Sequence, residues 1–135
     1  MYQSVVIVGY LGTDPEMRYT PTGVPVTSFR VAVNRRWTTP EGEQKEKTTW
    51  FRVTAWRRLA ETCNEFLRKG RLVLVEGELE PDESGNPRIW VGNDGVVRAS
   101  YEITARRVKF LGPAPSAEEA TFEELPEVSE EEIPF

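Results

Sequence analysis

The stretch TTWFRVTAWRRLAETCNEFLRKGRLVLVEGELE, residues 48–80, changes its hydrophobic period twice. Residues 48–56 alternate as a half-buried β-strand does, and residues 71–80 return to a strand pattern. Between them, Leu59, Cys63, Phe66 and Leu67 share one face of a predicted helix. Gly70 stands where a helix C-terminal cap is expected. The stretch therefore predicts a strand, a helix and a second strand in succession.

The flanking sequence adds further predicted strands. Alternating or β-branched runs cover residues 2–12, 24–37, 88–91 and 96–111. A turn-rich segment at 13–23 and a charged loop at 38–47 separate the early strands. Three strands, one helix and two strands is an order compatible with a five-stranded OB-fold, an all-β Greek-key barrel. Periodicity alone also allows another small β-barrel with one helix.

The net charge of −5 averages two unlike regions. Residues 1–112 carry all 17 Lys and Arg against 14 acids, whereas residues 113–135 carry 8 acids and no base. A positive body with an acidic tail is typical of proteins that face nucleic acid. Residues 113–135, rich in Pro, Ala, Ser and Glu, are predicted to be a disordered acidic tail behind a single domain at 1–112. A merely solubilising tail would leave its terminal Ile-Pro-Phe unexplained.

Enzyme and cofactor motifs are missing from the sequence. There is no histidine, and Cys63 is the single cysteine, so no zinc cluster can form. Gly-rich phosphate-binding motifs are also missing. We therefore expect a binding protein without a cofactor. No apolar run is long enough to span a membrane, no signal peptide is recognised, and one cysteine suits a reducing cytoplasm.

The four tryptophans each have an arginine within three positions, in the contexts NRRW, TTWFRV, AWRR and PRIW. Indole faces can stack on any nucleobase, and neighbouring arginines can hold phosphates. The alternative is that the tryptophans belong to the core. Burial is hard for Trp37 and Trp90 at loop junctions, Trp56 is intermediate, and for Trp50 the core interpretation stays open.

Three stretches resemble the bacterial single-stranded-DNA-binding proteins. They are VVIVGYLGTDPEMRYTPTGVPVTSFRVAVNRRW, TTWFRVTAWRRLAETCNEFLRKGRLVLVEGEL and the terminal EEEIPF. The resemblance implies an OB-fold, four copies to an assembly, and single-stranded DNA wrapped over aromatic side chains. Trp37, Trp50 and Trp90 match the family's stacking tryptophans, and Trp56 matches a stacking phenylalanine. Arg18, Arg52, Arg58, Lys69, Arg88 and Arg98 match its basic positions.

Together with the arginines beside the tryptophans, the predicted DNA-backbone residues are Arg18, Arg35, Arg36, Arg52, Arg57, Arg58, Lys69, Arg88 and Arg98. The resemblance also implies a partner-binding tip for replication, recombination and repair proteins, formed by Glu130, Glu131, Glu132, Ile133, Pro134 and Phe135. The terminal Phe offers an apolar anchor and a carboxylate at one place. The sequence departs from the family at Phe51, where a histidine is common, and at PDESGNP, an insertion.

Three rival functions explain less of the sequence. An OB-fold replication-restart or RNA-binding protein gives no reason for EEEIPF. A small-barrel enzyme lacks a base, a nucleophile or a metal cluster. A scaffold that works only through its tail would make the pairing of Trp with Arg accidental. The sequence thus favours a cytoplasmic, nucleoid-associated single-strand-binding protein.

Overall fold

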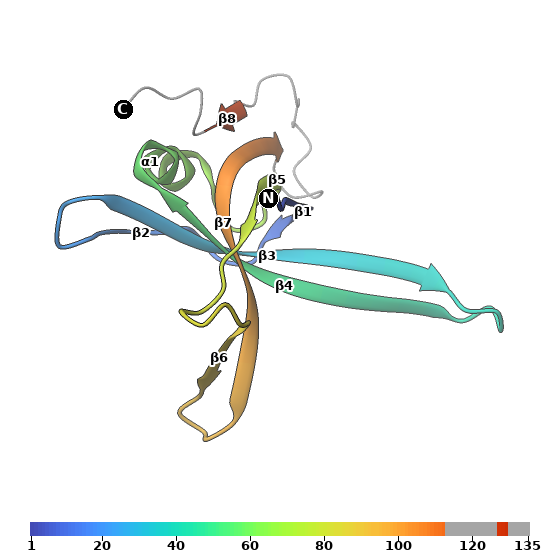
Figure 1. Ribbon diagram of the computed structural model, residues 1–135. Coiled ribbons are helices and arrows are strands. Elements are labelled where there is room, and N and C mark those ends of the chain that lie inside the picture. The colour runs from blue at the N-terminus through green and yellow to red at the C-terminus, as the bar shows by residue number, and fades with distance from the viewer. Residues whose placement is uncertain (113–126, 130–135) are drawn as a thin grey trace.

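The computed structural model describes residues 1–112 and 127–129, which form eight strands and one helix (Figure 1). In chain order the elements are β1 Val5–Leu11, β2 Glu16–Tyr19, β3 Pro25–Thr38, β4 Gln44–Trp56, α1 Arg57–Phe66, β5 Leu72–Leu79, β6 Arg88–Val91, β7 Val97–Gly112 and β8 Glu127–Ser129.

Five of the strands close into a barrel. The hydrogen-bonded order is β1-β5-β7-β4-β3, and β3 pairs again with β1 through Tyr10↔Ala32 and Leu11↔Val31. The β4–β7 pair is parallel, and the other pairs around the barrel are antiparallel. The helix lies in the chain between the third and fourth barrel strands. The predicted five-stranded OB-fold barrel with one helix is confirmed.

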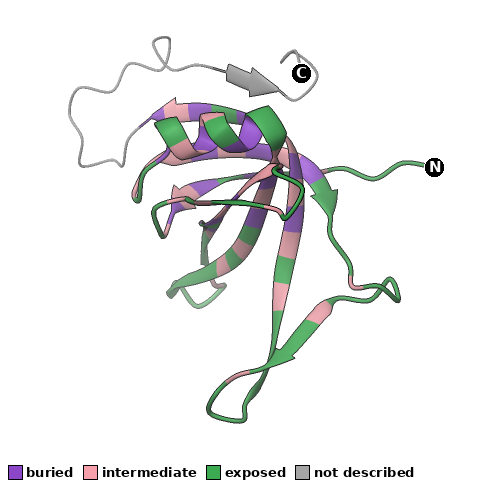
Figure 2. Cartoon of the chain, turned by 90° about the vertical axis from the view of Figure 1, so that its left-hand side faces the viewer, coloured by how far each residue is buried: buried purple, intermediate pink, exposed green. Residues whose placement is uncertain are grey.

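The barrel core comes from the inward-facing positions of these strands and from one face of α1. Val31, Val53 and Ile103 have no exposed surface, and the helix contributes Leu59, Ala60 and Cys63. The buried hydroxyl of Thr27 donates to the Ala60 carbonyl at 2.6 Å and so ties β3 to the helix. Buried residues gather where α1 lies against the strands, whereas the hairpins that extend from the barrel are largely exposed (Figure 2).

The helix ends earlier than predicted. It stops at Phe66, and Leu67 is extended because its side chain enters the core with no exposed surface. The Arg68 guanidinium donates to the carbonyls of Asn64 and Leu67 and so satisfies this end of the helix. The prediction that Gly70 caps the helix was wrong: with φ +90° it lies in the next turn, where its N–H donates to the Leu11 carbonyl.

Two hairpins extend beyond the barrel. We call residues 34–48 of β3 and β4 the arm, and residues 88–100 of β6 and β7 the wing (Figure 1). Strand pairing in the arm continues to Thr38↔Gln44, so the predicted loop at 38–47 shrinks to a turn closed by Gly42 at φ +85°. The short strand β2, within the predicted turn-rich segment, pairs with β3 from Glu16↔Ser28 to Tyr19↔Pro25.

The predicted disordered tail lies mostly at residues 113–126 and 130–135, outside the described residues. Within it, the short strand β8 pairs antiparallel with β7 through Arg107↔Ser129, Val108↔Val128 and Lys109↔Glu127. The sequence did not predict this pairing. In the described part of the chain, no helix is long and apolar enough to cross a membrane.

Burial on the inner face of α1 makes Cys63 a source of pH-dependent stability. Desolvation raises the pKa of the Cys63 thiol from its ordinary value of 9.0 to about 12. Between these values the unfolded chain loses the thiol proton and the folded chain keeps it. Unfolding then releases a proton, so the free energy of unfolding falls as pH rises above 9, by at most about 1.4 kcal/mol per pH unit.

Urea denaturation at pH 8, 9 and 10 checks this for the wild-type chain and Cys63→Ala. Loss of the sulfur lowers stability at every pH by a constant amount, and the variant lacks the thiol's titration. We expect the stability difference between the two chains to shrink above pH 9. Parallel pH profiles would contradict the predicted contribution.

Candidate nucleic-acid interface

A groove of about 1120 Å³ lies between β4, at the base of the arm, and the wing. Its lining comes from β3, β4, β6 and β7, so residues far apart in the sequence meet there. Five predicted site residues line it: Trp50, Arg52, Arg88, Trp90 and Arg98. Four further lining residues that matter below, Arg30, Lys47, Phe51 and Tyr101, were not predicted as site residues.

The two groove tryptophans are exposed. Trp50 keeps 42% and Trp90 46% of its surface accessible, so neither belongs to the core. Trp50 faces outward because it shares its strand parity with Arg52, whereas Val53 and Ala55 on the opposite parity are buried. The open question about Trp50 is settled in favour of a surface position. Accessible indole faces in a groove are suited to stacking on flat rings.

The groove is strongly basic. Its lining contains five basic side chains, Arg30, Lys47, Arg52, Arg88 and Arg98, and one acid, Glu102. Arg30 and Arg52 are cross-strand partners on β3 and β4, so their charges add on the same face. Such a surface attracts an anionic chain and releases the counterions condensed on it.

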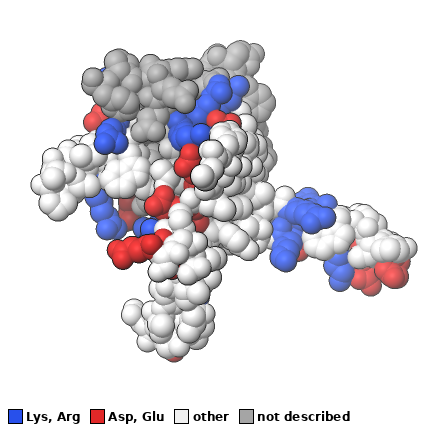
Figure 3. Space-filling view, in the orientation of Figure 1, with Lys and Arg blue, Asp and Glu red and all other residues white. Residues whose placement is uncertain are grey.

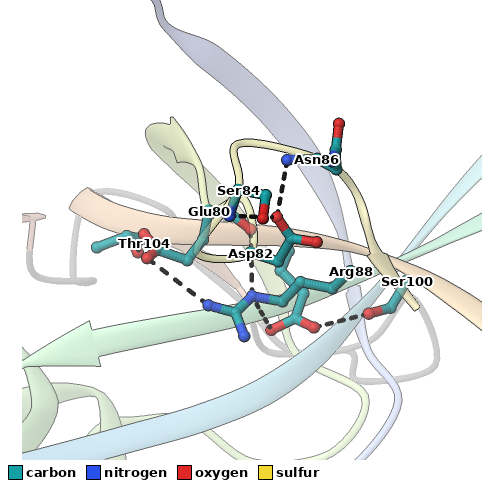
Figure 4. Close-up of polar contacts among 8 residues, drawn as sticks. Glu80, Asp82, Ser84, Asn86, Arg88, Ser100 and Thr104 are labelled. Carbon is teal, nitrogen blue, oxygen red and sulfur yellow. Dashed lines mark hydrogen bonds and ion pairs between the residues drawn. The ribbon is translucent and has the colours of Figure 1, made fainter. Parts of the chain in front are cut away.

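Arg88 is held at the base of the wing by two acids (Figure 4). Its Nε donates to the Glu80 carbonyl at 3.3 Å, and its guanidinium lies 3.9 Å from the Glu80 carboxylate and 3.8 Å from that of Glu102. Thr104 donates to Glu80 at 2.7 Å, and Ser100 donates to Glu102 at 2.8 Å, which orients both acids. Arg88 therefore fastens the wing to the barrel as well as lining the groove.

The predicted insertion PDESGNP forms an ordered turn beside this network. Asp82 Oδ1 accepts the backbone N–H groups of Ser84 and Asn86, each at 2.9 Å (Figure 4). The turn returns the chain to Glu80, whose carbonyl accepts from Arg88, and β6 begins at this arginine.

Arg98 is paired within the wing. Its guanidinium donates to both oxygens of Asp94, at 3.1 and 2.7 Å. The hydrogen bond from Arg98 holds the pKa of Asp94 below its ordinary value, and the pair raises the pKa of Arg98. Both side chains are exposed, so the pair orients Arg98 more than it stabilises the fold.

A second hollow of about 490 Å³ lies beside the first, and Arg18 lines it. Arg30 and Arg52 line both hollows, which places three arginines along one path. Asp14 and Glu16 also line the second hollow, and Glu16 lies 3.5 Å from Arg18. The second hollow is therefore less basic than the groove.

The remaining predicted tryptophans lie outside the groove. Trp37 is on the arm, 39% exposed, with the Arg35 guanidinium 5.3 Å from its ring centroid. Arg36 on the same arm lies 3.6 Å from Glu46, and basic side chains stand out along the arm in Figure 3. The arm thus presents its own pairing of an aromatic ring with basic groups.

The junction of β4 and α1 carries Trp56, Arg57 and Arg58. Trp56 is half-buried and is the N-cap residue of the helix, whereas both arginines are exposed. Lys69 lies beyond the helix, where its backbone N–H donates to Asp14 at 2.8 Å. None of these four residues lines the groove.

The sequence did contain a signal for two of the overlooked residues. Arg30 lies on β3 and Lys47 on β4, the two strands that pair with each other along the arm. The turn at Gly42 fixes their register and so places Arg30 opposite Arg52. Tyr101 and Phe51 meet across the parallel β4–β7 pair, with ring centroids 5.6 Å apart. That contact depends on a pairing which local sequence does not indicate.

Residues 1–112 contain no cluster of His, Cys, Asp or Glu that could hold a metal ion. The predicted partner-binding tip, Glu130 to Phe135, lies outside the described residues, so it stays a prediction.

Comparison with known proteins assigns the chain to a family. The sequence model of the single-strand binding protein family matches residues 2–111. The chain belongs to this family. The family's description is that of binding proteins, so the prediction of a binding protein that is not an enzyme is confirmed. The recognised resemblance is confirmed as well.

Relatives of this family member include single-stranded DNA-binding proteins from several bacteria. The protein of Neisseria meningitidis serogroup B is 40% identical over 108 residues, 80% of this chain and 59% of that protein. The protein of Thermotoga maritima is 37% identical over 132 residues, 98% of this chain and 89% of that protein. The chain therefore spans about three fifths of the Neisseria relative and most of the Thermotoga one.

A solved structure supports the same assignment. The small single-stranded DNA-binding protein from Streptomyces coelicolor matches this family member with a TM-score of 0.66 and 30% identity. The match covers 80% of this chain and 93% of that one.

Arg57 has an unusual backbone that can be tested. Its φ of +60° is the one positive value at a non-glycine residue in the described segments. Left-handed geometry costs a side-chain-bearing residue roughly 1–2 kcal/mol, and glycine escapes most of that cost. We expect Arg57→Gly to be about 1 kcal/mol more stable to urea than Arg57→Ala, although both lack the guanidinium. Equal stabilities would show that the turn carries no such strain.

Proposed function

We propose that the chain binds single-stranded DNA without sequence specificity. In this proposal bases stack on Trp37, Trp50, Trp56 and Trp90, and the predicted arginines and lysine contact phosphates. The observation that carries it is the groove, where two exposed indoles stand among five basic side chains. Stacking accepts any base, because every base has a π-face.

The overlooked groove residues extend the proposed site. Arg30 and Lys47 would add phosphate contacts, and Tyr101 is 62% exposed and lines the same groove. A duplex would not use these groups well, since its bases are stacked on one another and cannot reach the indoles. Preference for single strands therefore follows from the aromatic lining.

The wider role is part of the same proposal. The domain at 1–112 would protect single strands during replication, recombination and repair, and the tail at 113–135 would recruit partner proteins through Glu130 to Phe135. We also propose assembly into homotetramers. Val6 and Val8 are exposed on β1, and β1 pairs with β3 only at Tyr10 and Leu11, which leaves an apolar strand edge available to another copy.

Titration with oligo(dT), followed by intrinsic tryptophan fluorescence at several salt concentrations, tests DNA binding. We expect Trp50→Ala to weaken binding by roughly 1–3 kcal/mol without changing the salt slope, because it removes a stacked base and no charge. Arg52→Ala should instead reduce the salt slope by about 0.7, the share of one phosphate on a single strand. Tyr19→Ala, an exposed aromatic that does not line the groove, is the control.

Glu102→Gln gives a change of opposite sign. It removes the acid of the groove and weakens the hold on Arg88, so affinity for oligo(dT) should rise.

Equal affinity for a duplex of the same length, or no fluorescence change with any DNA, would contradict the proposal.

The tail is tested by truncation before Glu130. A chain ending at Ser129 should bind oligo(dT) at least as tightly as the full chain, because the deleted residues include three acids and no base. It should no longer capture proteins that the full chain retains from a bacterial extract. If DNA binding were lost together with capture, the separation of roles between body and tip would be wrong.

A further inference from the structure

Trp50 is enclosed on two sides in the groove. The Arg30 guanidinium carbon lies 4.6 Å from the Trp50 ring centroid, over one face of the indole. Gly12 abuts the far edge of the same ring: a Cβ at this position would lie 2.3 Å from Trp50 Cζ3 and 2.7 Å from Cη2. No real Cβ contact is so short, so any side chain at position 12 would push the ring aside.

Backbone conformation does not explain this glycine. Gly23, Gly42 and Gly85 have φ values above +80°, which favours glycine, and a Cβ on them would meet nothing. Gly12 is not among the glycines with positive φ, so alanine could adopt its backbone. Position 12 must lack a side chain because the indole of Trp50 occupies the space that a Cβ would need.

The two neighbours of Trp50 are also joined to one another. The Gly12 N–H donates to the Arg30 carbonyl at 2.9 Å, one residue beyond the pairing that closes the barrel at Leu11↔Val31. On β3 and β4, the register sets Arg30 opposite Arg52 and Ala32 opposite Trp50. The positions of both neighbours are therefore fixed by barrel closure.

We propose that Gly12 and Arg30 are positioning residues for Trp50, and that they leave one indole face open to a base. Stacking on the covered face is blocked, because a guanidinium at 4.6 Å occupies the space a base needs. A strand in the groove must then pass Trp50 on a single side. This inference rests on the proposed binding of single-stranded DNA, and it deepens that proposal by fixing the orientation of one stacking platform.

A double-mutant cycle with oligo(dT) tests the inference. Gly12→Ala moves the ring, and Arg30→Met keeps an apolar stem but removes the guanidinium. Each change should weaken binding roughly two- to tenfold in the wild-type chain. In the Trp50→Ala chain, Gly12→Ala should have little further effect, and the effect of Arg30→Met should shrink to the loss of its own phosphate contact. Arg35→Met is the matched control, since Arg35 covers Trp37 on the arm at 5.3 Å, and its effect should be the same with and without Trp50.

A spectroscopic readout separates positioning from a general loss of structure. The emission of Trp50 is the difference between the spectra of Gly12→Ala and Gly12→Ala/Trp50→Ala. The wavelength of this emission should differ from that of Trp50 in the wild-type chain, obtained as the difference between the wild-type and Trp50→Ala spectra. The urea midpoint of Gly12→Ala should stay close to that of the wild type. If Gly12→Ala does not fold, the Arg30→Met cycle gives the answer alone.

Each outcome has a distinct meaning. Effects of Gly12→Ala and Arg30→Met that persist undiminished without Trp50 would overturn the inference and leave DNA binding intact. So would full binding by Trp50→Ala, because the chain would then bind single strands without this platform. A wild-type chain that does not bind oligo(dT) would instead overturn the proposed function.

Discussion

The contact that closes the barrel determines the rest of the structure. β1 crosses β3 so closely that a Cβ at Gly9 would lie 2.2 Å from the Ala32 carbonyl oxygen. The approach allows the short β1–β3 pairing, and through it the base of the arm and the first turn after β1 come together. Without it, the part of β3 beyond its pairing with β2 would have a free edge, and neither the core nor the groove would have a fixed geometry.

Closure also explains how one pair of strands serves both core and groove. In β4, the inward parity carries Val53 and Ala55, and the outward parity carries Trp50 and Arg52. Because side chains alternate, every residue that packs the barrel leaves its neighbour facing outward. The arm and the wing continue these strands past the core. The walls of the groove are therefore held in place by strands that pair in the barrel.

Much of this could be predicted from the sequence, and the exceptions have physical causes. Alternation and the change of period at Arg57 located the barrel strands and the helix. The short strand β2 was missed because Pro15 and Pro21 flank it and its order comes from pairing with β3. The space needed at Gly12 and the contact of Phe51 with Tyr101 depend on strands paired across the barrel, which no local pattern reveals.

The basic residues of the groove are not equivalent once their partners are considered. Within residues 1–112, Arg88 and Arg98 already face carboxylates, whereas Lys47 and Arg52 form no ion pair. When a phosphate displaces a carboxylate from an arginine, the freed carboxylate attracts a cation of its own. The uptake of that cation offsets the counterion that is released from the DNA. The ion pairs of Arg88 and Arg98 hold the wing in place, and in the proposed complex these two arginines would add less to the salt dependence than their charges suggest. The salt dependence of binding would come chiefly from the unpaired cations beside Trp50.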